Sequence, residues 1–446
     1  MKKTKRYLAL LLTAVLLLTA LAGCGKEQPD EPETSAATEA TETTETTAAT
    51  EATETTTESA ALTEAAGYGN NTVAALSNYA VSTAAPSDEI MSAIVAVDAE
   101  NHPLMTNAAL QICYWIEFYG FMSNYGEYAY LLGLDYSTPL AEQNCSEDRT
   151  WEQYFLEAAT QHFCQNYALA QTAYAEGYTL PEEDVATIDD IADPNGDFAA
   201  EASEAGYDSP EAYIMANFGD GTGVADYQDY LRMYYAAADY YVRLCDSVEN
   251  ALTDAEVEAY YDENAATYEE SRVFKQNNVT VRHILIAPEG DKDETLNDWT
   301  EEQWAAAETK AAEIYTLWQE DPTEESFAAF ATDYTDDPGS AENGGLYEDF
   351  ATNEMVEEFS DWCFDPERAP GDSGIVKTSY GYHIMYFVEQ TETRAWFDTA
   401  RTDMANGRIE ERIEELCETY PVRFDYTLVR VFDMVSKMAE EETPQG

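Results

Sequence analysis

The sequence predicts an α+β protein in which a small module of strands and helices, residues 278–390, lies between mostly helical segments. Two short runs rich in β-branched and aromatic residues, 281–286 and 377–385, predict strands that bracket this module. Amphipathic helical patterns fill the interval between the two runs, and aromatic-rich helical patterns precede the module. At 446 residues, the chain is long enough for two or three domains.

The charge balance is strongly acidic. The chain has 88 Asp and Glu against 22 Lys and Arg, which gives a formal charge of −66. Such a surface repels nucleic acid and anionic lipid, so both are excluded as partners. Attraction of cations or basic polypeptides is one consequence, although a generally acidic proteome is the simpler explanation of the charge and the one we favour.

The N-terminus has the pattern of a targeting segment, residues 1–24. A basic start precedes a largely apolar run, Leu8 to Leu18, that is too short to span a membrane comfortably. The run ends in Leu21-Ala22-Gly23-Cys24, which resembles the lipobox of bacterial lipoproteins. That resemblance implies cleavage before Cys24 and its lipidation. An uncleaved membrane anchor is the alternative, and either interpretation places the bulk of the protein outside the cytoplasm.

Two further stretches lack the apolar periodicity of folded segments. Residues 25–66 are nearly all Thr, Glu, Ala and Ser, which predicts a disordered linker. Residues 438–446 are predicted to be a disordered tail.

The six remaining cysteines are scattered, with no C-x-x-C pair and no Cys/His spacing typical of a metal site. Four lie in apolar helical contexts and are predicted to be buried thiols: Cys113, Cys164, Cys245 and Cys363. A disulfide between Cys145 and Cys164 stays open. No metal and no cofactor are predicted.

Residues 67–277 are predicted to be mostly helical. Three aromatic-rich helices are expected at 107–125, 151–174 and 227–244. A fourth begins after Thr253, where Glu256 completes a capping box. Aromatic stripes of this kind most often form helix–helix core, but an exposed share would suit the binding of unfolded chains. Residues 391–437 return to helix, followed by a short strand-like stretch at 424–431.

Two of the four histidines occupy matching strand contexts. The period of two places His283 on the face of Val281 and His383 on the face of Met385. A single histidine among apolar residues is usually a satisfied core residue. Two of them, with the motifs between them, point instead to a functional site.

The motifs between the histidines are Phe327–Ala331, Tyr334–Leu346, Met355–Phe359 and Gly374–Thr378. Taken in order, they resemble the parvulin family of peptidyl-prolyl cis/trans isomerases over roughly a quarter of the chain. The wider layout is similar to the PrsA-type foldase lipoproteins of Gram-positive bacteria. The resemblance implies a four-stranded antiparallel sheet with helices, inserted into a chaperone-like domain formed by residues 67–277 and 391–437.

The resemblance also implies a site. The expected catalytic residues are His283, His383, Asp337 and Thr378, with the two imidazoles bonded to each other across adjacent strands. Met355 and Phe359 are expected to form a cup for the proline ring. Each residue also has a structural interpretation, because Asp337-Pro338-Gly339 is favourable turn sequence and the cup residues are ordinary core residues.

One position departs from the family pattern. Many parvulins continue the double glycine with Asp-Leu-Gly, whereas Gly344-Gly345 is followed here by Leu346-Tyr347-Glu348. Tyr347 therefore replaces an apolar residue of the substrate-binding cup, which puts the turnover rate in question. The acidic loop Asp291–Glu294 also stands where phosphate-directed parvulins carry basic residues, so recognition of phosphoserine is not expected.

The function implied by the resemblance is an extracytoplasmic, membrane-anchored prolyl isomerase and foldase for secreted proteins. Its partners would be unfolded polypeptides with X–Pro bonds and the membrane, through a lipid anchor, and a homodimer stays open. The alternative is a catalytically weak or inactive holdase. A solute-binding lipoprotein would need alternating βαβ units, and a protease would need a nucleophile elbow, which Ser340, Ser373 and Ser379 lack.

Overall fold

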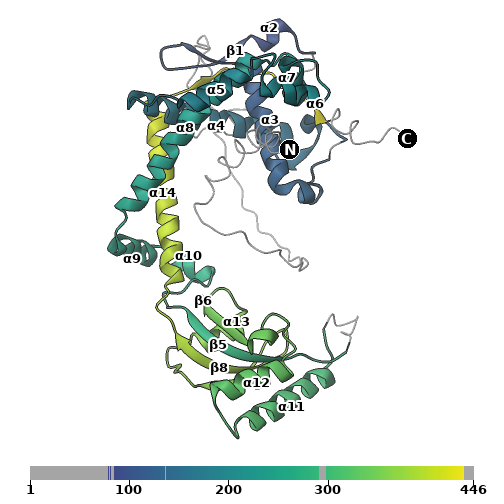
Figure 1. The fold of residues 1–446 in the computed structure, drawn as a ribbon, viewed down its shortest axis with the longest axis vertical. Coiled ribbons are helices and arrows are strands. Elements are labelled where there is room, and N and C mark those ends of the chain that lie inside the picture. The colour runs from purple at the N-terminus through teal and green to yellow at the C-terminus, as the bar shows by residue number, and fades with distance from the viewer. Residues whose placement is uncertain (1–78, 80, 82–84, 136, 291–297, 436–446) are drawn as a thin grey trace, which may run out of the picture. The chain divides into compact units, whose positions relative to one another are not determined.

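The computed structural model describes residues 79, 81, 85–135, 137–290 and 298–435, and Figure 1 shows their helices and strands. Several predicted features lie outside these residues: the targeting segment 1–24 with Cys24, the linker 25–66, the loop Asp291–Glu294 and the tail 438–446. The expectations for them stay predictions. In the part of the chain that is described, no helix is both long and apolar enough to cross a membrane.

The chain divides into two compact units. Unit 1 consists of residues 1–250 and 406–446, and unit 2 consists of residues 251–405. Unit 2 is therefore inserted into unit 1 along the sequence, and it combines helices with an antiparallel sheet. The predicted α+β class with an inserted strand-and-helix module is confirmed.

Unit 1 is mostly helical and includes short strands. Its helices are α2 (Asp88–Met91), α3 (Asn107–Tyr125), α4 (Trp151–Ala175), α5 (Glu182–Asp190), α6 (Asp197–Glu204), α7 (Pro210–Phe218) and α8 (Val224–Ala251), with 3₁₀ turns η3 (Gly126–Leu132) and η4 (Leu140–Glu142). Its strands are β1 (Ile94–Val97), β2 (Pro103–Thr106), β3 (Asn144–Ser146), β4 (Arg149–Thr150) and β9 (Arg423–Phe424). The helices predicted at 107–125, 151–174 and 227–244 are confirmed, whereas β1 to β4 were not predicted.

The C-terminal segment closes unit 1 through its backbone. Strand β9 pairs with β1, which places β1 in the middle of a sheet ordered β2-β1-β9. Beyond β9, the buried amides of Asn107 and Gln111 on α3 bond the main chain of residues 428–432. The strand predicted over 424–431 is wrong beyond Phe424, because these side-chain amides, and a turn built on Asp425, replace the partners that a strand would need.

Unit 2 holds the predicted module. Its helices are α9 (Asp254–Glu263), α10 (Ala265–Glu270), α11 (Glu301–Trp318), α12 (Glu324–Tyr334) and α13 (Glu357–Cys363), with the 3₁₀ turn η5 (Ala341–Asn343). Its strands are β5 (Val279–Ile286), β6 (Leu346–Phe350), β7 (Ser373–Lys377) and β8 (Tyr382–Gln390), and α14 (Ala395–Thr419) runs from unit 2 into unit 1 along the sequence. Thr253 and Glu256 form the predicted capping box of α9.

The four strands of unit 2 form one antiparallel sheet in the order β6-β5-β8-β7. On one face, Ile284 and Ile384 pack with the buried residues of α11 and α12. Those of α11 recur at the helical spacing seen in the sequence: Ala307, Ala311, Ile314 and Trp318. On the other face, Val281 and Met385 pack with α13. Figure 1 shows α11 and α12 beside β5 and β8. The period of two therefore divides each central strand between two separate cores.

Two local predictions for unit 2 need correction. Residues 377–385 are not one strand: β7 ends at Lys377, and β8 begins at Tyr382. Gly381 has a φ of 153°, and a Cβ there would lie 2.4 Å from the carbonyl oxygen of Ile286, so the chain turns where a side chain does not fit. The spacing of Met355, Phe359, Trp362 and Cys363 predicts a helix over these residues, but the helix begins at Glu357, so Met355 precedes it.

The cysteines of the described chain are all free thiols. Cys164 is buried and Cys145 is half-buried, so the disulfide that the sequence left open is not formed. The four cysteines predicted to be buried thiols are buried.

Candidate active site

Two imidazoles meet on one face of the sheet in unit 2. The register pairs His283 of β5 with Met385 of β8, and Leu285 with His383, so the two histidines are diagonal neighbours on adjacent strands. Their Nδ1 atoms are 3.0 Å apart, and their rings stack with centroids 5.2 Å apart. Only 3% of His283 and 6% of His383 is exposed.

Each histidine has a further partner at its other ring nitrogen. The Nε2 of His283 lies 2.9 Å from Oδ2 of Asp337 and 3.1 Å from Oγ of Ser340. The Nε2 of His383 lies 2.8 Å from Oγ1 of Thr378, which is itself buried. All four nitrogen atoms of the pair are therefore engaged, and the structure brings together the four residues that the sequence singled out: His283, His383, Asp337 and Thr378.

The loop after α12 carries Asp337 to the histidines. The backbone N–H of Asp336 donates to the carbonyl of Leu285, and the Asp336 carboxylate accepts from the N–H of Ala287, which fixes this loop to the end of β5. Oδ1 of Asp337 accepts from the N–H of Gly339, as in an Asx turn, while Oδ2 faces His283. One carboxylate therefore serves both the turn and the site: Oδ1 stabilises the turn, and Oδ2 binds His283.

The double glycine lets the same loop reach β5. The N–H of His283 donates to the carbonyl of Gly345 at 2.8 Å. Gly345 has a φ of 74°, and a Cβ on it would lie 2.1 Å from the carbonyl oxygen of His283. Any side chain at this position would therefore push the loop, and with it Asp337, away from the imidazoles.

Three donors converge on Oδ2 of Asp337. They come from His283, from the hydroxyl of Ser340, and from the hydroxyl of Tyr347, which lies 3.1 Å away. The hydrogen bond from His283 is the main reason that the pKa of Asp337 falls well below its usual value, and Ser340 contributes. Asp337 is therefore an anion at neutral pH, and its carboxylate is occupied by donors from its own chain.

The neighbouring groups are held neutral. Burial, and then the nearby His283, lower the pKa of His383 to about 3. Burial and the charge of Asp337 raise the pKa of Tyr347 to about 12, so its hydroxyl keeps its proton. Within the described part of the chain, no three or more His, Cys, Asp or Glu side chains are grouped so as to hold a metal ion.

These protonation states assign the direction of the network. The anion of Asp337 only accepts, so Nε2 of His283 donates to it. When His283 is neutral, its Nδ1 then carries a lone pair and accepts from Nδ1 of His383. The Nε2 of His383 in turn accepts from the hydroxyl of Thr378, which accepts from the N–H of Tyr380. Each hydrogen bond from Thr378 through the two histidines to Asp337 thus has one defined donor and one defined acceptor.

An apolar wall lies against the imidazoles. The ring of Phe359 meets both His283 and His383 edge-on, at centroid distances of 5.4 and 5.3 Å. Phe359 is only 2% exposed, whereas Tyr347 and Met355 are half-buried and pack on the same cluster. The ring of Tyr347 lies 5.1 Å from that of His283. The three predicted cup residues belong to one cluster, but Phe359 is almost fully buried in it, whereas the other two are partly exposed.

Ser340 is the residue of this site that the sequence analysis missed. It was considered only as a protease nucleophile, although it is completely buried and bonds both Asp337 and His283. The available signal was its spacing: a serine three residues after an aspartate, in a turn, can place its hydroxyl on that carboxylate.

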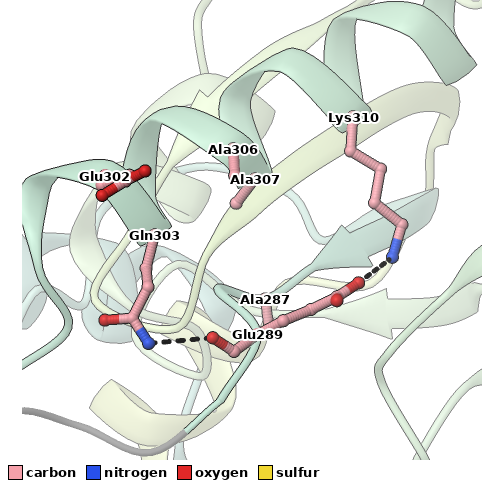
Figure 2. Close-up of a pocket in the computed structure, with 7 residues that line it drawn as sticks. All are labelled: Ala287, Glu289, Glu302, Gln303, Ala306, Ala307 and Lys310. Atoms are coloured by element: carbon pink, nitrogen blue, oxygen red, sulfur yellow. Dashed lines mark hydrogen bonds and ion pairs between the residues drawn. The ribbon is translucent and has the colours of Figure 1, made fainter.

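A separate hollow of about 420 Å³ lies between α11 and the segment that follows β5, as Figure 2 shows. Lys310 pairs with the carboxylate of Glu289, and the side chain of Gln303 donates to the Glu289 carbonyl. None of the predicted site residues lines it. It belongs to the α11 side of the sheet, and the imidazoles belong to the α13 side.

The sequence of unit 2 matches a known family over most of its length. Residues 266–391 match the family described as the PPIC-type PPIASE domain. This segment is a PPIC-type PPIASE domain. The match includes β5 to β8, both histidines and the loop with Asp337, so the site described above lies entirely within the PPIC-type domain.

Relatives of the chain carry the name foldase protein PrsA. The chain is 34% identical to foldase protein PrsA 1 of Listeria innocua over 26% of its own length and 32% of that protein. It is 29% identical to foldase protein PrsA of Caldanaerobacter subterraneus over 39% of its own length and 48% of that protein. The chain thus spans about a third to a half of the length of these relatives.

Solved structures that are similar to this chain include PrsA of Bacillus cereus and foldase protein PrsA of Streptococcus pneumoniae. The first is 19% identical, with a TM-score of 0.24, and the match covers 66% of this chain and 95% of that one. The second is 18% identical, with a TM-score of 0.28, and the match covers 58% of this chain and 82% of that one.

Proposed function

We propose that this protein is an extracytoplasmic, membrane-anchored peptidyl-prolyl cis/trans isomerase and foldase that assists the folding of secreted proteins. The observation that carries the proposal is the buried network from Thr378 through His383 and His283 to Asp337, set against an apolar wall inside a PPIC-type domain. The foldase name of the relatives supports the second part.

The reaction needs no nucleophile, metal or cofactor. Rotation about the X–Pro bond is opposed by amide resonance, with a barrier of about 18–20 kcal/mol. A catalyst has only to bind the twisted bond more tightly than either planar form. An apolar surface for the proline ring and a fixed polar surface beside the carbonyl meet that need.

The polar residues serve that need by staying in place. In this proposal, His283 and His383 form the fixed polar wall, and Thr378 and Asp337 hold the two rings from either end. Because the Asp337 carboxylate is occupied by three donors at Oδ2 and one at Oδ1, it acts through His283 rather than by binding the substrate. Asp337 is therefore a positioning residue, and so is Ser340.

Two of the apolar residues offer a surface to the substrate, and the third supports the imidazoles. Tyr347 and Met355 are half-buried and offer their side chains to a proline ring, while Phe359 supports both imidazoles from behind. A pyrrolidine ring would thus rest on one aromatic and one thioether side chain. The Tyr347 hydroxyl is already bonded to Asp337, so the ring edge that it presents is fixed.

The cellular setting of the proposal comes from the N-terminal sequence. The lipobox-like Leu21-Ala22-Gly23-Cys24 supports an anchor at Cys24, with residues 25–66 as the linker to the folded units. Residues 67–277 and 391–437 would be the chaperone-like domain, and residues 278–390 the isomerase. Labelling with a radioactive fatty acid tests the anchor: we expect label on the wild type and none on Cys24→Ser, and label on both would reject Cys24 as the site.

A second candidate function is a holdase in which the PPIC-type domain is structural. The observation in its favour is Phe359, which is almost fully buried, and Tyr347, whose bulkier ring takes the place of the family's apolar residue. Both reduce the surface left for a proline ring. This candidate keeps the partners of the first and drops only the catalysis.

A refolding assay limited by proline isomerisation separates the two functions. We expect wild type to accelerate refolding and His283→Ala to lose about a hundredfold in catalytic efficiency, as when a fixed polar group is removed from a site. His102→Ala is the matched control, because His102 is an exposed histidine of unit 1. Equal rates for wild type and His283→Ala would leave only the holdase.

A further inference from the structure

Unit 1 contains a groove that the isomerase site does not explain. It has a volume of about 300 Å³ and lies between the strand β2 and the helices α3, α4 and α8, so all of its lining belongs to unit 1. That volume is at the lower end of the range for ligand sites. The groove can therefore take one large side chain of a partner, and not a folded surface.

The walls of the groove are mainly apolar. Leu104 and Met105 of β2 face it from one side, and Phe163 and Tyr167 of α4, whose rings are stacked 6.3 Å apart, line it from another. β2 is the outer strand of the sheet ordered β2-β1-β9, so the groove runs beside a sheet edge. An extended polypeptide is the kind of partner that fits beside an edge strand and inserts a side chain next to it.

One hydroxyl of the lining lacks a partner. Tyr230 of α8 is 7% exposed, and its hydroxyl is buried with no hydrogen-bond partner among the described residues. A buried hydroxyl without a partner is costly, typically about 1–3 kcal/mol, and most are satisfied. The hydroxyl is closed to solvent in this structure, so a peptide group in the groove would supply the missing partner once the side chains that cover it move aside.

The acidic side chains at the groove outnumber the basic one. Asp229 bonds Arg232 at 2.9 Å, and this arginine also lies 3.5 Å from Asp189. Asp226 lines the groove as well, is half-buried, and makes no ion pair within the described chain. Uncompensated negative charge beside an apolar pocket selects a ligand that carries positive charge next to an apolar group.

We propose that this groove is a second polypeptide-binding site, which takes one large apolar side chain of an extended segment with Lys or Arg beside it. The proposal rests on the proposed function, because the segment would belong to an unfolded client. The formal charge of −66 favours the approach of such basic segments over long distances. The groove then retains a client independently of its prolines.

The direct test is binding of labelled, proline-free peptides to the full chain, followed by fluorescence anisotropy. One peptide has a single Phe between two Lys in a Gly/Ser background, the second has Glu in place of Lys, and the third has Ala in place of Phe. We expect the first to bind about tenfold more tightly than either of the others, and the difference from the Glu peptide to shrink at high salt. Equal binding of the Lys and Glu peptides would overturn the charge selection.

Substitutions in the groove then locate the site. Gln171→Trp, from α4, fills the groove and is expected to weaken binding at least tenfold. Asp226→Asn is expected to weaken binding of the Lys peptide about threefold to tenfold, while the matched control Asp208→Asn, at an exposed position of unit 1, leaves it unchanged. Unchanged binding by Gln171→Trp would reject the groove.

Tyr230→Phe guards against variants that fail to fold. If the hydroxyl serves a bound peptide, removing it should raise the thermal stability of the free protein and still weaken peptide binding. If Tyr230 is purely structural, Tyr230→Phe would lower both the thermal stability and the peptide affinity, or raise both. Either result would contradict the proposal. If no peptide binds and Gln171→Trp dissolves a dimer seen by sedimentation, the occupant is a second copy and the proposal also fails.

Failure of the proposed function would look different. His283→Ala should bind the proline-free peptides as wild type does, and the groove variants should isomerise a short proline peptide as wild type does. Loss of isomerase activity throughout, with groove-dependent binding intact, would reject the isomerase and keep the groove.

Discussion

Each compact unit packs a histidine, partly buried in unit 1 and buried in unit 2, against one main partner, and the partners differ. In unit 1, His162 of α4 lies 2.7 Å from the carboxylate of Glu117 on α3. In unit 2, His383 faces a second imidazole, that of His283. Burial disfavours the charged form of both rings, but Glu117 outweighs it and raises the pKa of His162, whereas His283 adds to it and lowers the pKa of His383 to about 3.

The contrast shows what a histidine pair provides. The Glu117 carboxylate favours the charged form of His162, and the resulting ion pair is a structural use of the histidine. His383, beside another imidazole, stays neutral at neutral pH, so its N–H keeps a fixed hydrogen-bond direction without burying a positive charge. A twisted imide has no net charge, and a neutral, oriented wall is suited to it.

The largest expected effect comes from moving the loop of unit 2 away from its histidines. Gly345→Ala places a Cβ 2.1 Å from a backbone carbonyl at a φ of 74°, and neither group can give way cheaply. We expect the free energy of unfolding of unit 2 to fall by about 3 kcal/mol or more. Hydrogen exchange of the β5 and β8 amides measures it.

Gly407→Ala is the control for that substitution. Gly407 lies in α14, and a Cβ there meets nothing within 4 Å. Alanine should therefore stabilise the helix by about 0.5–1 kcal/mol. If the β5 amides of Gly345→Ala exchange as slowly as those of wild type, then the loop does not approach the backbone of His283 as closely as described.

The second prediction removes the carboxylate from each histidine in turn. Asp337→Asn keeps the shape of the side chain but loses the anion that fixes Nε2–H of His283, so we expect isomerase efficiency to fall about thirtyfold to a hundredfold. Glu117→Gln removes the equivalent partner of His162 and should leave the isomerase unchanged. A short proline peptide is the substrate for both, and equal losses would contradict the separate roles.

These contrasts were only partly accessible from the sequence. The alternation of residues in β5 and β8 was enough to place each histidine on the apolar face, and the capping box at Thr253 and Glu256 was enough to start α9. Such features depend on neighbours in the sequence. The diagonal meeting of His283 and His383 depends on strand register, which only the resemblance to a family suggested.

The features that escaped prediction depend on distant contacts. Ser340 has no local signal stronger than its spacing from Asp337, and its role arises because the loop returns to β5. The segment after Phe424 has the residues of a strand, yet Asn107 and Gln111 bind its backbone from a helix some three hundred residues earlier along the chain. Side-chain partners of this kind replace a strand without leaving a pattern.

The third prediction is the dependence of the two units on pH. The pKa of His383 in the folded protein is about 3, below the ordinary 6.5, so between these values the unfolded chain holds a proton that the folded one does not. The free energy of unfolding of unit 2 should therefore fall as the pH falls, by about 2 kcal/mol from pH 7 to pH 5. Asp337 adds a further loss below about pH 4, because its carboxylate must then be protonated.

His162 should have the opposite sign. Its pKa is raised in the folded protein, so protonation stabilises unit 1 as the pH falls through that pKa. Proton NMR of the imidazole rings distinguishes the two: His162 should titrate above pH 6.5, and His383 should show no titration down to pH 4. A His383 signal that titrates near its ordinary value would end the contrast between the units.

The smallest expected effect separates the hydroxyl of Tyr347 from its ring. Tyr347→Phe removes one of three donors to Oδ2 of Asp337, which should cost about 1 kcal/mol of stability and lower isomerase efficiency about threefold to fivefold. Tyr315→Phe is the control, because that hydroxyl bonds Ser373 on α11's side of the sheet, at 2.9 Å. It should have a similar cost in stability and no effect on catalysis.

Tyr347→Leu then tests the ring. Leucine loses the same hydrogen bond but restores the apolar side chain that many parvulins carry at this position, with less bulk than the tyrosine ring. If the ring narrows the cup, Tyr347→Leu should isomerise a proline peptide faster than Tyr347→Phe, although both lack the hydroxyl. If the two variants are equally slow, the hydroxyl is the whole contribution of Tyr347, because the cup then tolerates either side chain and only the anchoring of Asp337 has changed.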